Sequence, residues 1–115
     1  MICKRGDVIL VRFPNSDLRT YKKRPALVVR ADGLATDLSQ TLIALITSNL
    51  ARTGATRIPF SQHSADGKSM GLLKDSVIVT DNLATVLYRE IDKTIGHCPA
   101  MPAVDQALKR TLGLA

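Results

Sequence analysis

Aromatic residues are scarce in this chain, which has 115 residues with two Tyr, two Phe and no Trp. A hydrophobic core must therefore come from aliphatic side chains, chiefly Val, Ile, Leu and Ala. Rows of aromatic rings on which nucleic-acid bases stack are almost excluded as well. The apolar fraction of 45% is still that of a globular protein. A chain of this length can bury roughly two-thirds of its unfolded surface, so a core is feasible without disulfides or metal.

Little in the chain supports a disulfide framework, a metal centre or a membrane anchor. Its two cysteines, Cys3 and Cys98, are far apart and form no C-x-x-C motif, which fits a reduced compartment. His63 and His97 are isolated, so no cluster has metal-ligand spacing, and we expect His63 to be exposed in a loop. The apolar run 42–46 is far too short to span a bilayer, and the N-terminus lacks the apolar segment of a signal peptide. The sequence predicts a cytoplasmic protein that needs no cofactor.

Two widespread kinds of catalytic motif are also missing. The sequence contains neither G-x-x-x-x-G-K-[ST] nor G-x-G-x-x-G, the glycine-rich loops that bind nucleotide phosphates. It also lacks the G-x-S-x-G turn that exposes a nucleophilic serine. P-loop nucleotide hydrolysis and serine-hydrolase chemistry are therefore excluded as functions.

The positive charge of the chain is concentrated near its N-terminus. The net charge is +6 and the isoelectric point about 9.8. Residues 31–115 hold as many basic as acidic side chains, so the excess lies in residues 1–30, which contain only Asp7 and Asp17 as acids. The basic residues of that segment are Lys4, Arg5, Arg12, Arg19, Lys22, Lys23, Arg24 and Arg30. Such a field attracts phosphate backbones or an acidic protein, although a solvated basic face would look the same.

Short apolar runs between turn-forming residues predict a mainly β protein. The expected strands are residues 8–13, 25–30, 42–47, 56–59, 76–80 and 85–88. The run 42–47 does not alternate with polar residues, so we expect that strand to be buried on both faces. Loops are expected at residues 18–23 and 61–69, and a short helical turn at residues 89–93.

The C-terminus has a helical period instead. Apolar residues recur along one face, at Met101, Val104, Ala107, Leu108 and Leu112. Pro102 suits the first turn of a helix, and Gly113 suits its end. Several strands followed by one helix predict a single domain, residues 1–115, built as a small antiparallel barrel or curled sheet that the helix covers.

Polar side chains gather where predicted strands begin or end. Arg24 precedes Pro25, and proline biases its neighbour toward an extended form, which holds the guanidinium near a rigid strand. A guanidinium matches a pair of phosphate oxygens. Hydroxyls follow the buried strand at Thr47 and Ser48, and polar residues interrupt the chain again at 80–82. Ordinary turn chemistry explains the last two groups equally well.

Five segments of the chain resemble, in order, the MazF/PemK family of toxins from type II toxin–antitoxin systems. They are residues 6–14, 23–29, 45–48, 71–79 and 93–96, followed by the C-terminal helix. The paired opening segments are the most specific of these. The resemblance implies a mainly β (α+β) fold, namely a small SH3-like, partly open β-barrel of the CcdB/MazF type with a C-terminal helix. It also implies a homodimer that cleaves single-stranded RNA without a metal and is neutralised by a cognate antitoxin protein.

The resemblance also implies which residues act. Arg24 matches the essential arginine of the family motif, Thr47 its threonine, and Asp81 with Asn82 an acid–amide pair of some members. We expect Arg24, Thr47 and Asp81 to be catalytic. The expected substrate-binding residues are Arg19, Lys22, Lys23, Ser48 and Asn82. Some members carry a basic residue two positions before the acid, where this chain has Val79, so either Arg24 supplies the cationic chemistry alone or activity is reduced or lost.

The expected reaction uses the nucleophile that RNA itself carries. Attack of a 2′-hydroxyl on the adjacent phosphate would give a 2′,3′-cyclic phosphate and a 5′-hydroxyl end. Arg24 would stabilise phosphate charge, Thr47 would hydrogen-bond a non-bridging oxygen, and Asp81 would act as base or orient Arg24. Two other functions stay open: a CcdB-like toxin that binds gyrase, and a non-catalytic nucleic-acid-binding barrel.

Overall fold

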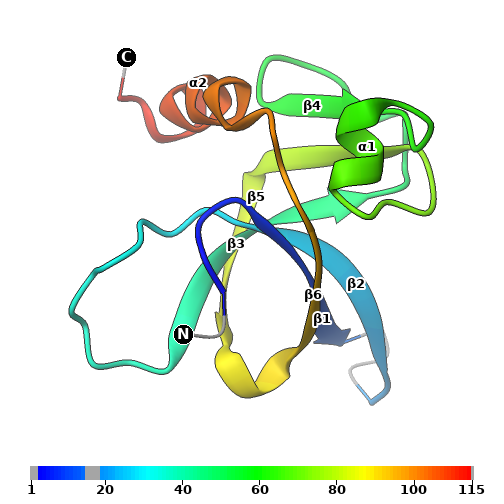
Figure 1. The fold of residues 1–115 in the computed structure, drawn as a ribbon. Coiled ribbons are helices and arrows are strands. Elements are labelled where there is room, and N and C mark those ends of the chain that lie inside the picture. Colours follow the sequence, from blue (N-terminus) through cyan, green and yellow to red (C-terminus); the bar gives the residue numbers. More distant parts are fainter. Residues whose placement is uncertain (1–2, 15–18, 115) are drawn as a thin grey trace.

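The computed structural model describes residues 3–14 and 19–114 as one curved sheet with helices at one end (Figure 1). The strands are β1 (Asp7–Pro14), β2 (Tyr21–Val28), β3 (Gln40–Thr47), β4 (Arg57–Phe60), β5 (Ser76–Leu87) and β6 (Ile91–His97). The helices are α1 (Ala65–Ser69) and α2 (Met101–Leu112), and η1 (Tyr88–Glu90) is a single 3-10 turn. The strands pair antiparallel in the order β4-β5-β3-β2-β1-β6. In the described ranges β4 and β6 do not pair with each other, which confirms the predicted partly open barrel with a C-terminal helix.

The sheet carries a core on each of its faces. On β2 and β3, Leu27 and Ala44 join one apolar cluster, whereas Val28 and Ile43 join the other. Because side chains alternate along a strand, a strand that is apolar at consecutive positions serves both clusters. The buried pattern of β3 thus confirms the prediction that this strand is covered on both sides.

The predicted C-terminal helix is present and covers one of these clusters. Val104 is fully buried in the cluster that contains Leu27, and Leu108 packs against it. Pro102 lies in the first turn, and Gly113 ends the helix in the left-handed conformation, with φ at 69°. No helix in the described part of the chain is long and apolar enough to cross a membrane.

Two of the predicted loops are partly regular structure. The expected loop 18–23 is wrong for residues 21–23, which extend β2, while Leu18 lies outside the described residues. The expected loop 61–69 contains α1, whose N-cap is Ser64: its Oγ accepts a hydrogen bond from the backbone N–H of Gly67 at 3.0 Å. Pairing with β1 explains the first difference, and a local side-chain cap explains the second.

The predicted strands near the C-terminus also differ from the structure. The runs 76–80 and 85–88 belong to one strand, β5, because the polar residues between them form a bulge instead of a turn: the partner in β5 jumps from Leu83 to Val79 between adjacent residues of β3. The helical turn expected at 89–93 is η1 followed by β6, an edge strand that pairs with β1.

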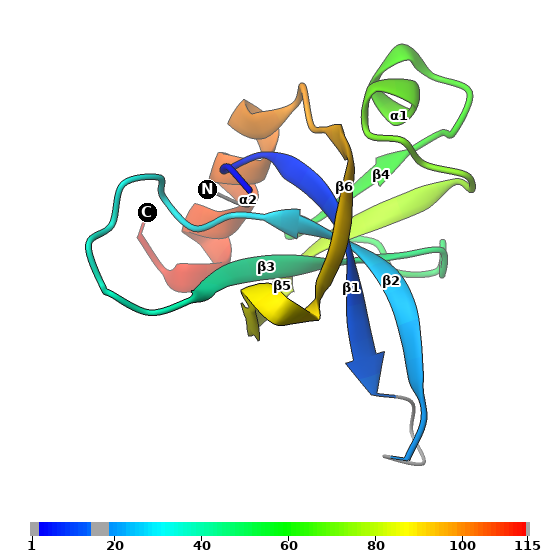
Figure 2. The same cartoon turned by 60° about the horizontal axis from the view of Figure 1, so that its bottom comes forward.

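The β1–β2 hairpin extends away from the rest of the sheet (Figure 2). Val8 pairs with Leu27 near the centre of the molecule, and Arg12 pairs with Lys23 toward the tip. The hairpin therefore begins in the core and carries its basic residues outward.

Candidate functional site

A cavity of about 470 Å³ lies where β2, β3 and β6 meet the segment that precedes β5. Its basic lining residues are Lys22, Lys23, Arg24, Lys74 and Lys93. Its apolar lining is Leu10, Pro25, Ile46, Gly71, Leu72, Leu73 and Ile95, and its hydroxyl groups belong to Thr47, Ser48 and Ser76. An apolar floor with a basic rim suits a ligand that combines anionic groups with flat apolar ones.

Arg24 and Thr47 both line this cavity. The β2–β3 ladder ends at the pair Ala26–Leu45, and Arg24 and Thr47 each lie two residues beyond that pair, at the same end of the ladder. Pro25 lies in the cavity wall beside Arg24 and fixes the strand there. Arg24 is exposed, so no other part of the described chain covers its side chain.

The Thr47 hydroxyl is oriented by the turn that follows β3. Its Oγ1 accepts a hydrogen bond from the backbone N–H of Asn49 at 3.1 Å. The hydroxyl hydrogen then remains available to a ligand oxygen, since a hydroxyl both accepts and donates. Ser48, directly after the strand, is exposed on the same cavity.

No carboxylate lines the cavity in the described part of the chain. Lys23 forms an ion pair with Asp92 at 3.3 Å, and both side chains are partly solvent-exposed. Basic side chains that converge on a hollow with apolar walls create a local positive potential, which attracts anions. Of these residues, the sequence predicted Lys22, Lys23 and Arg24.

Sequence reasoning missed Lys74 and Lys93. Both belong to the part of the chain whose charges balance along the sequence, and they reach the cavity only because the segment before β5 and the strand β6 fold against β2. Each lies within a segment that resembles the family, residues 71–79 for Lys74 and residues 93–96 for Lys93, and this is the one signal that could have indicated them.

The structure places Asp81 elsewhere. Arg57 donates to both of its carboxylate oxygens, from Nε to Oδ1 at 3.3 Å and from Nη2 to Oδ2 at 3.0 Å, and Thr56 Oγ1 donates to Oδ1 at 3.1 Å. The hydrogen bonds from Arg57 lower the pKa of Asp81. Asp81 and its neighbour Asn82 are exposed on β5 and do not line the cavity that contains Arg24.

Two other positions bear on the predicted site. Arg19 is exposed before β2 and is not among the residues that line the cavity. Val79 is fully buried in β5, opposite Arg57 of β4 and Leu45 of β3. The cavity therefore gains its additional cations from Lys74 and Lys93, and not from the position that is basic in some members of the family.

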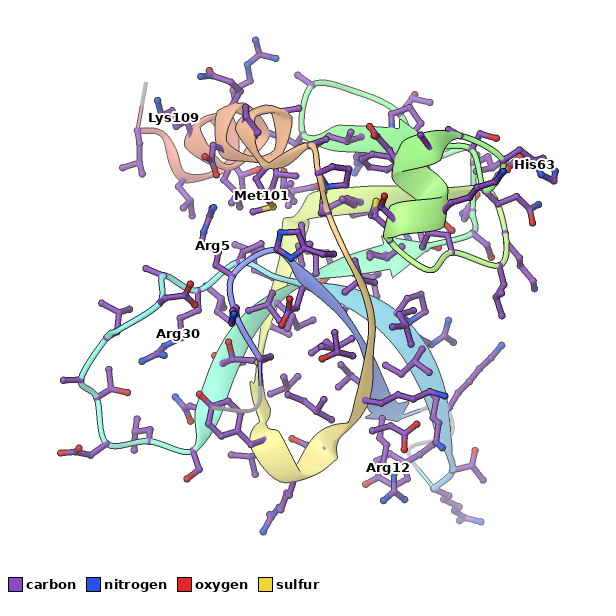
Figure 3. All side chains as sticks on the ribbon, viewed as in Figure 1. Arg5, Arg12, Arg30, His63, Met101 and Lys109 are labelled. Atoms are coloured by element: carbon purple, nitrogen blue, oxygen red, sulfur yellow. The ribbon has the colours of Figure 1, made fainter. Side chains whose placement is uncertain are left out.

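The cysteine and histidine side chains do not line the cavity. Burial raises the pKa of the thiols of Cys3 and Cys98, which keeps them protonated. His97 Nδ1 lies 3.2 Å from Asp7 Oδ1, and His63 is exposed, as predicted (Figure 3). Across residues 3–14 and 19–114, no group of three or more His, Cys, Asp or Glu side chains is placed to hold a metal ion.

The fold and the cavity are those of a small antiparallel barrel with a basic, apolar-floored site, and the chain matches a family of this kind. The family model describes PemK-like, MazF-like toxins of type II toxin–antitoxin systems, and it matches residues 4–112. The chain belongs to this family. None of the curated proteins compared with it matches significantly in sequence.

Solved structures of MazF toxins have the same fold. The Mycobacterium tuberculosis toxin MazF-mt6 aligns with a TM-score of 0.74 and 25% identity over 95% of this chain and 98% of that one. A mycobacterial endoribonuclease in complex with its cognate antitoxin aligns with a TM-score of 0.75 and 23% identity over 98% and 97% of the two chains. A MazE–MazF complex from Deinococcus radiodurans aligns with a TM-score of 0.73 and 17% identity over 100% and 99%.

Proposed function

We propose that this toxin is a sequence-selective endoribonuclease that cleaves single-stranded RNA in the cytoplasm without a metal. The observation that carries the proposal is the shared cavity of Arg24 and Thr47, with basic side chains around it and no carboxylate among the described residues that line it. A phosphodiester supplies the anionic oxygens for the rim, and the adjacent sugar and base supply flat apolar surface for the floor. The endoribonuclease activity of a mycobacterial protein with the same fold also supports it.

The proposed reaction is an internal transfer within the RNA. A bond forms between the 2′-oxygen and phosphorus, and the bond from phosphorus to the 5′-oxygen breaks. The products are a 2′,3′-cyclic phosphate and a 5′-hydroxyl end. Charge that accumulates on the non-bridging oxygens is stabilised by the guanidinium of Arg24 and by a hydrogen bond from Thr47.

Two protons move in this reaction. The 2′-hydroxyl must lose one, and the leaving 5′-oxygen must gain one. Arg24 stays protonated at neutral pH, so we assign it the role of polarising the water that protonates the leaving oxygen. We expected Asp81 to act as the base or to orient Arg24, but it is hydrogen-bonded to Arg57 and does not line the cavity. We assign the acceptor role to a second water molecule.

The other assigned residues bind the RNA backbone. We propose that Lys22, Lys23 and Ser48 contact phosphates next to the cleaved one, together with Lys74 and Lys93. Arg19 and Asn82 keep a proposed role in contacts further along the strand. We also propose that the toxin is a homodimer, as the family resemblance implies. A cognate antitoxin protein would neutralise it, as the complexes of two proteins with this fold suggest.

The decisive experiment is incubation of the purified protein with a long single-stranded RNA in the presence of EDTA. We expect discrete fragments that end in cyclic phosphate, and no cleavage by the Arg24→Ala variant. Uncut RNA in both samples would favour the gyrase-binding toxin or the non-catalytic barrel. Cleavage only in the absence of EDTA would contradict the metal-independent mechanism, and a smear without discrete bands would contradict sequence selectivity.

A further inference from the structure

The face of β2 that borders the cavity continues toward the tip of the hairpin. Side chains of a strand alternate between its two faces, so Tyr21, Lys23 and Pro25 lie on the same face of β2 as the buried Leu27. Leu27 belongs to the same apolar cluster as Ile46 and Leu72, which line the cavity. On β1, Arg12 continues the face of Leu10 in the same way. Tyr21 is four residues from Pro25, or about 13 Å along the strand. A ligand that leaves the cavity along β2 therefore passes Lys23 and reaches Tyr21.

A second hollow lies along this path. It has a volume of about 410 Å³ and is lined by Arg12, Tyr21, Lys22, Lys23 and Asp92. Lys22 and Lys23 line the cavity as well, so the two hollows are neighbours. Asp92 is the one carboxylate there within the described residues, and it is paired with Lys23 at 3.3 Å. Arg12 and Lys22 keep the hollow positive.

Tyr21 is an exposed aromatic ring supported by a cation. The residue is 58% exposed, and the guanidinium carbon of Arg12 lies 5.6 Å from the centre of its ring. Arg12 pairs with Lys23, and Tyr21, two residues before Lys23 in β2, is the diagonal neighbour of Arg12. The contact orients the ring and leaves much of it to solvent. Figure 3 shows Arg12 near the far end of the hairpin, away from the helices.

From this geometry we propose that Tyr21, backed by Arg12, is a stacking platform for one base of the single-stranded RNA, next to the nucleotide held in the cavity. The proposal rests on the proposed function for its ligand. Every base has a flat π face, so this contact adds affinity and is tolerant of sequence. Although aromatic residues are too scarce for rows of stacked bases, one exposed ring in a basic hollow suffices for a single base.

The composition of the chain allows a direct spectroscopic test. The chain has no Trp and only two Tyr, so in a Tyr88→Phe variant all tyrosine emission comes from Tyr21. The ligand is a pool of short, random-sequence 2′-O-methyl RNA oligonucleotides, whose blocked 2′-oxygens prevent cleavage. We expect the emission of Tyr21 to be quenched as the pool is titrated in. Binding without quenching would overturn the platform.

Affinity measurements with three variants complete the test. Tyr21→Ser should bind the pool at least about fivefold more weakly, the lower end of what one stacked base contributes. Tyr21→Phe keeps the ring and should bind as the wild type does. Leu38→Ser is the matched control, because Leu38 is 57% exposed but lies in the loop between β2 and β3, outside both hollows.

The outcomes separate this inference from the function on which it rests. If the wild-type protein neither binds the pool nor cleaves RNA, the proposed function is wrong and the platform with it. If the protein binds and cleaves but Tyr21→Ser has wild-type affinity, only the platform is wrong. Equal losses for Tyr21→Ser and Tyr21→Phe would likewise contradict stacking, since the ring would not be what the RNA contacts.

Discussion

Arg24 is the side chain whose removal should separate cleavage from folding. It is exposed and has no ion pair within the described residues, so Arg24→Ala should leave the melting temperature close to that of the wild type. Loss of a group that stabilises transition-state charge should slow RNA cleavage by about 100-fold or more. Single-turnover cleavage and thermal unfolding measure the two effects.

The matched control for this variant is Arg89→Ala. Arg89 is another exposed arginine, in η1, and does not line the cavity. We expect it to cleave RNA at the wild-type rate. Equal losses in the two variants would show that the effect follows total charge and not the position of Arg24.

Asp81 should stabilise the folded protein at neutral pH, and this contribution should be lost as the pH falls. Hydrogen bonds from Arg57 lower its pKa in the folded protein below the ordinary value of 3.8. A carboxylate with a lowered pKa stabilises the folded state at every pH above its unfolded-state pKa. That contribution shrinks as the pH falls below about 3.8 and vanishes below the folded-state pKa. Asp81→Asn should therefore melt earlier than the wild type at neutral pH, and the difference should disappear in strong acid.

Two further measurements decide between this role and the catalytic role that the family resemblance implies. Arg57→Ala should show at least as large a loss of stability at neutral pH, because it removes the other half of the pair and also a hydrogen bond to the carbonyl oxygen of Thr53. Asp81→Asn should keep its cleavage activity, since Asp81 lies outside the cavity. Lost cleavage with unchanged stability would make the carboxylate catalytic.

Among the helices and strands, the sequence predicted those that are specified by their own pattern of apolar and terminal residues. The helix α2 has a clear apolar face and both terminal signals, and β3 has an uninterrupted apolar run. The strand β6 has neither: its polar residues are tolerated because it is an edge strand, and only its pairing with β1 makes it regular. The bulge in β5 was unpredictable for the same reason, because polar residues at a bulge and at a turn look alike in sequence.

The residues of the candidate site also fall into two groups, those predicted from local sequence and those placed by strand pairing. Arg24 and Thr47 could be named because each lies at the end of a recognisable strand, within a segment that resembles the family. Lys74, Lys93 and the pairing of Asp81 with Arg57 depend on which strands become neighbours. One sequence contains no direct record of that register, so these contacts required the structure.

The approach of β6 to the segment after α1 gives a prediction at the same scale. A Cβ atom on Gly96 would clash with the carbonyl oxygen of Ser69, the last residue of α1, and with the carbonyl carbon of Met70. These are backbone atoms that cannot rotate away, so Gly96→Ala should destabilise the fold by about 1–3 kcal/mol, as overpacking does. Denaturant unfolding measures the change.

Thr94→Ala is the control on the same strand, because Thr94 is exposed. We expect it to unfold close to the wild-type midpoint. An unchanged midpoint for Gly96→Ala would mean that β6 and the segment after α1 are not packed this closely in solution.

For the whole molecule, charge is organised in space and not along the chain. The first quarter of the sequence holds the net excess, yet Lys74 and Lys93 come from the balanced remainder and lie on the same cavity as Lys22, Lys23 and Arg24. Lys109 and Arg110 lie in the last turn of α2, and neither of them lines the cavity. RNA should therefore approach one side of the molecule, with a strength that depends on salt.

The salt dependence of RNA binding reports how many phosphates contact this side of the molecule. For single-stranded nucleic acid, the slope of log K against log salt concentration is about −0.7 for each phosphate neutralised. Lys74→Ala and Lys93→Ala should each make the slope less steep by about 0.7 when binding of 2′-O-methyl RNA is titrated at several salt concentrations. Lys109→Ala should leave the slope unchanged. If all three lysines change it equally, RNA binding follows net charge alone, and the cavity is not where the strand lies.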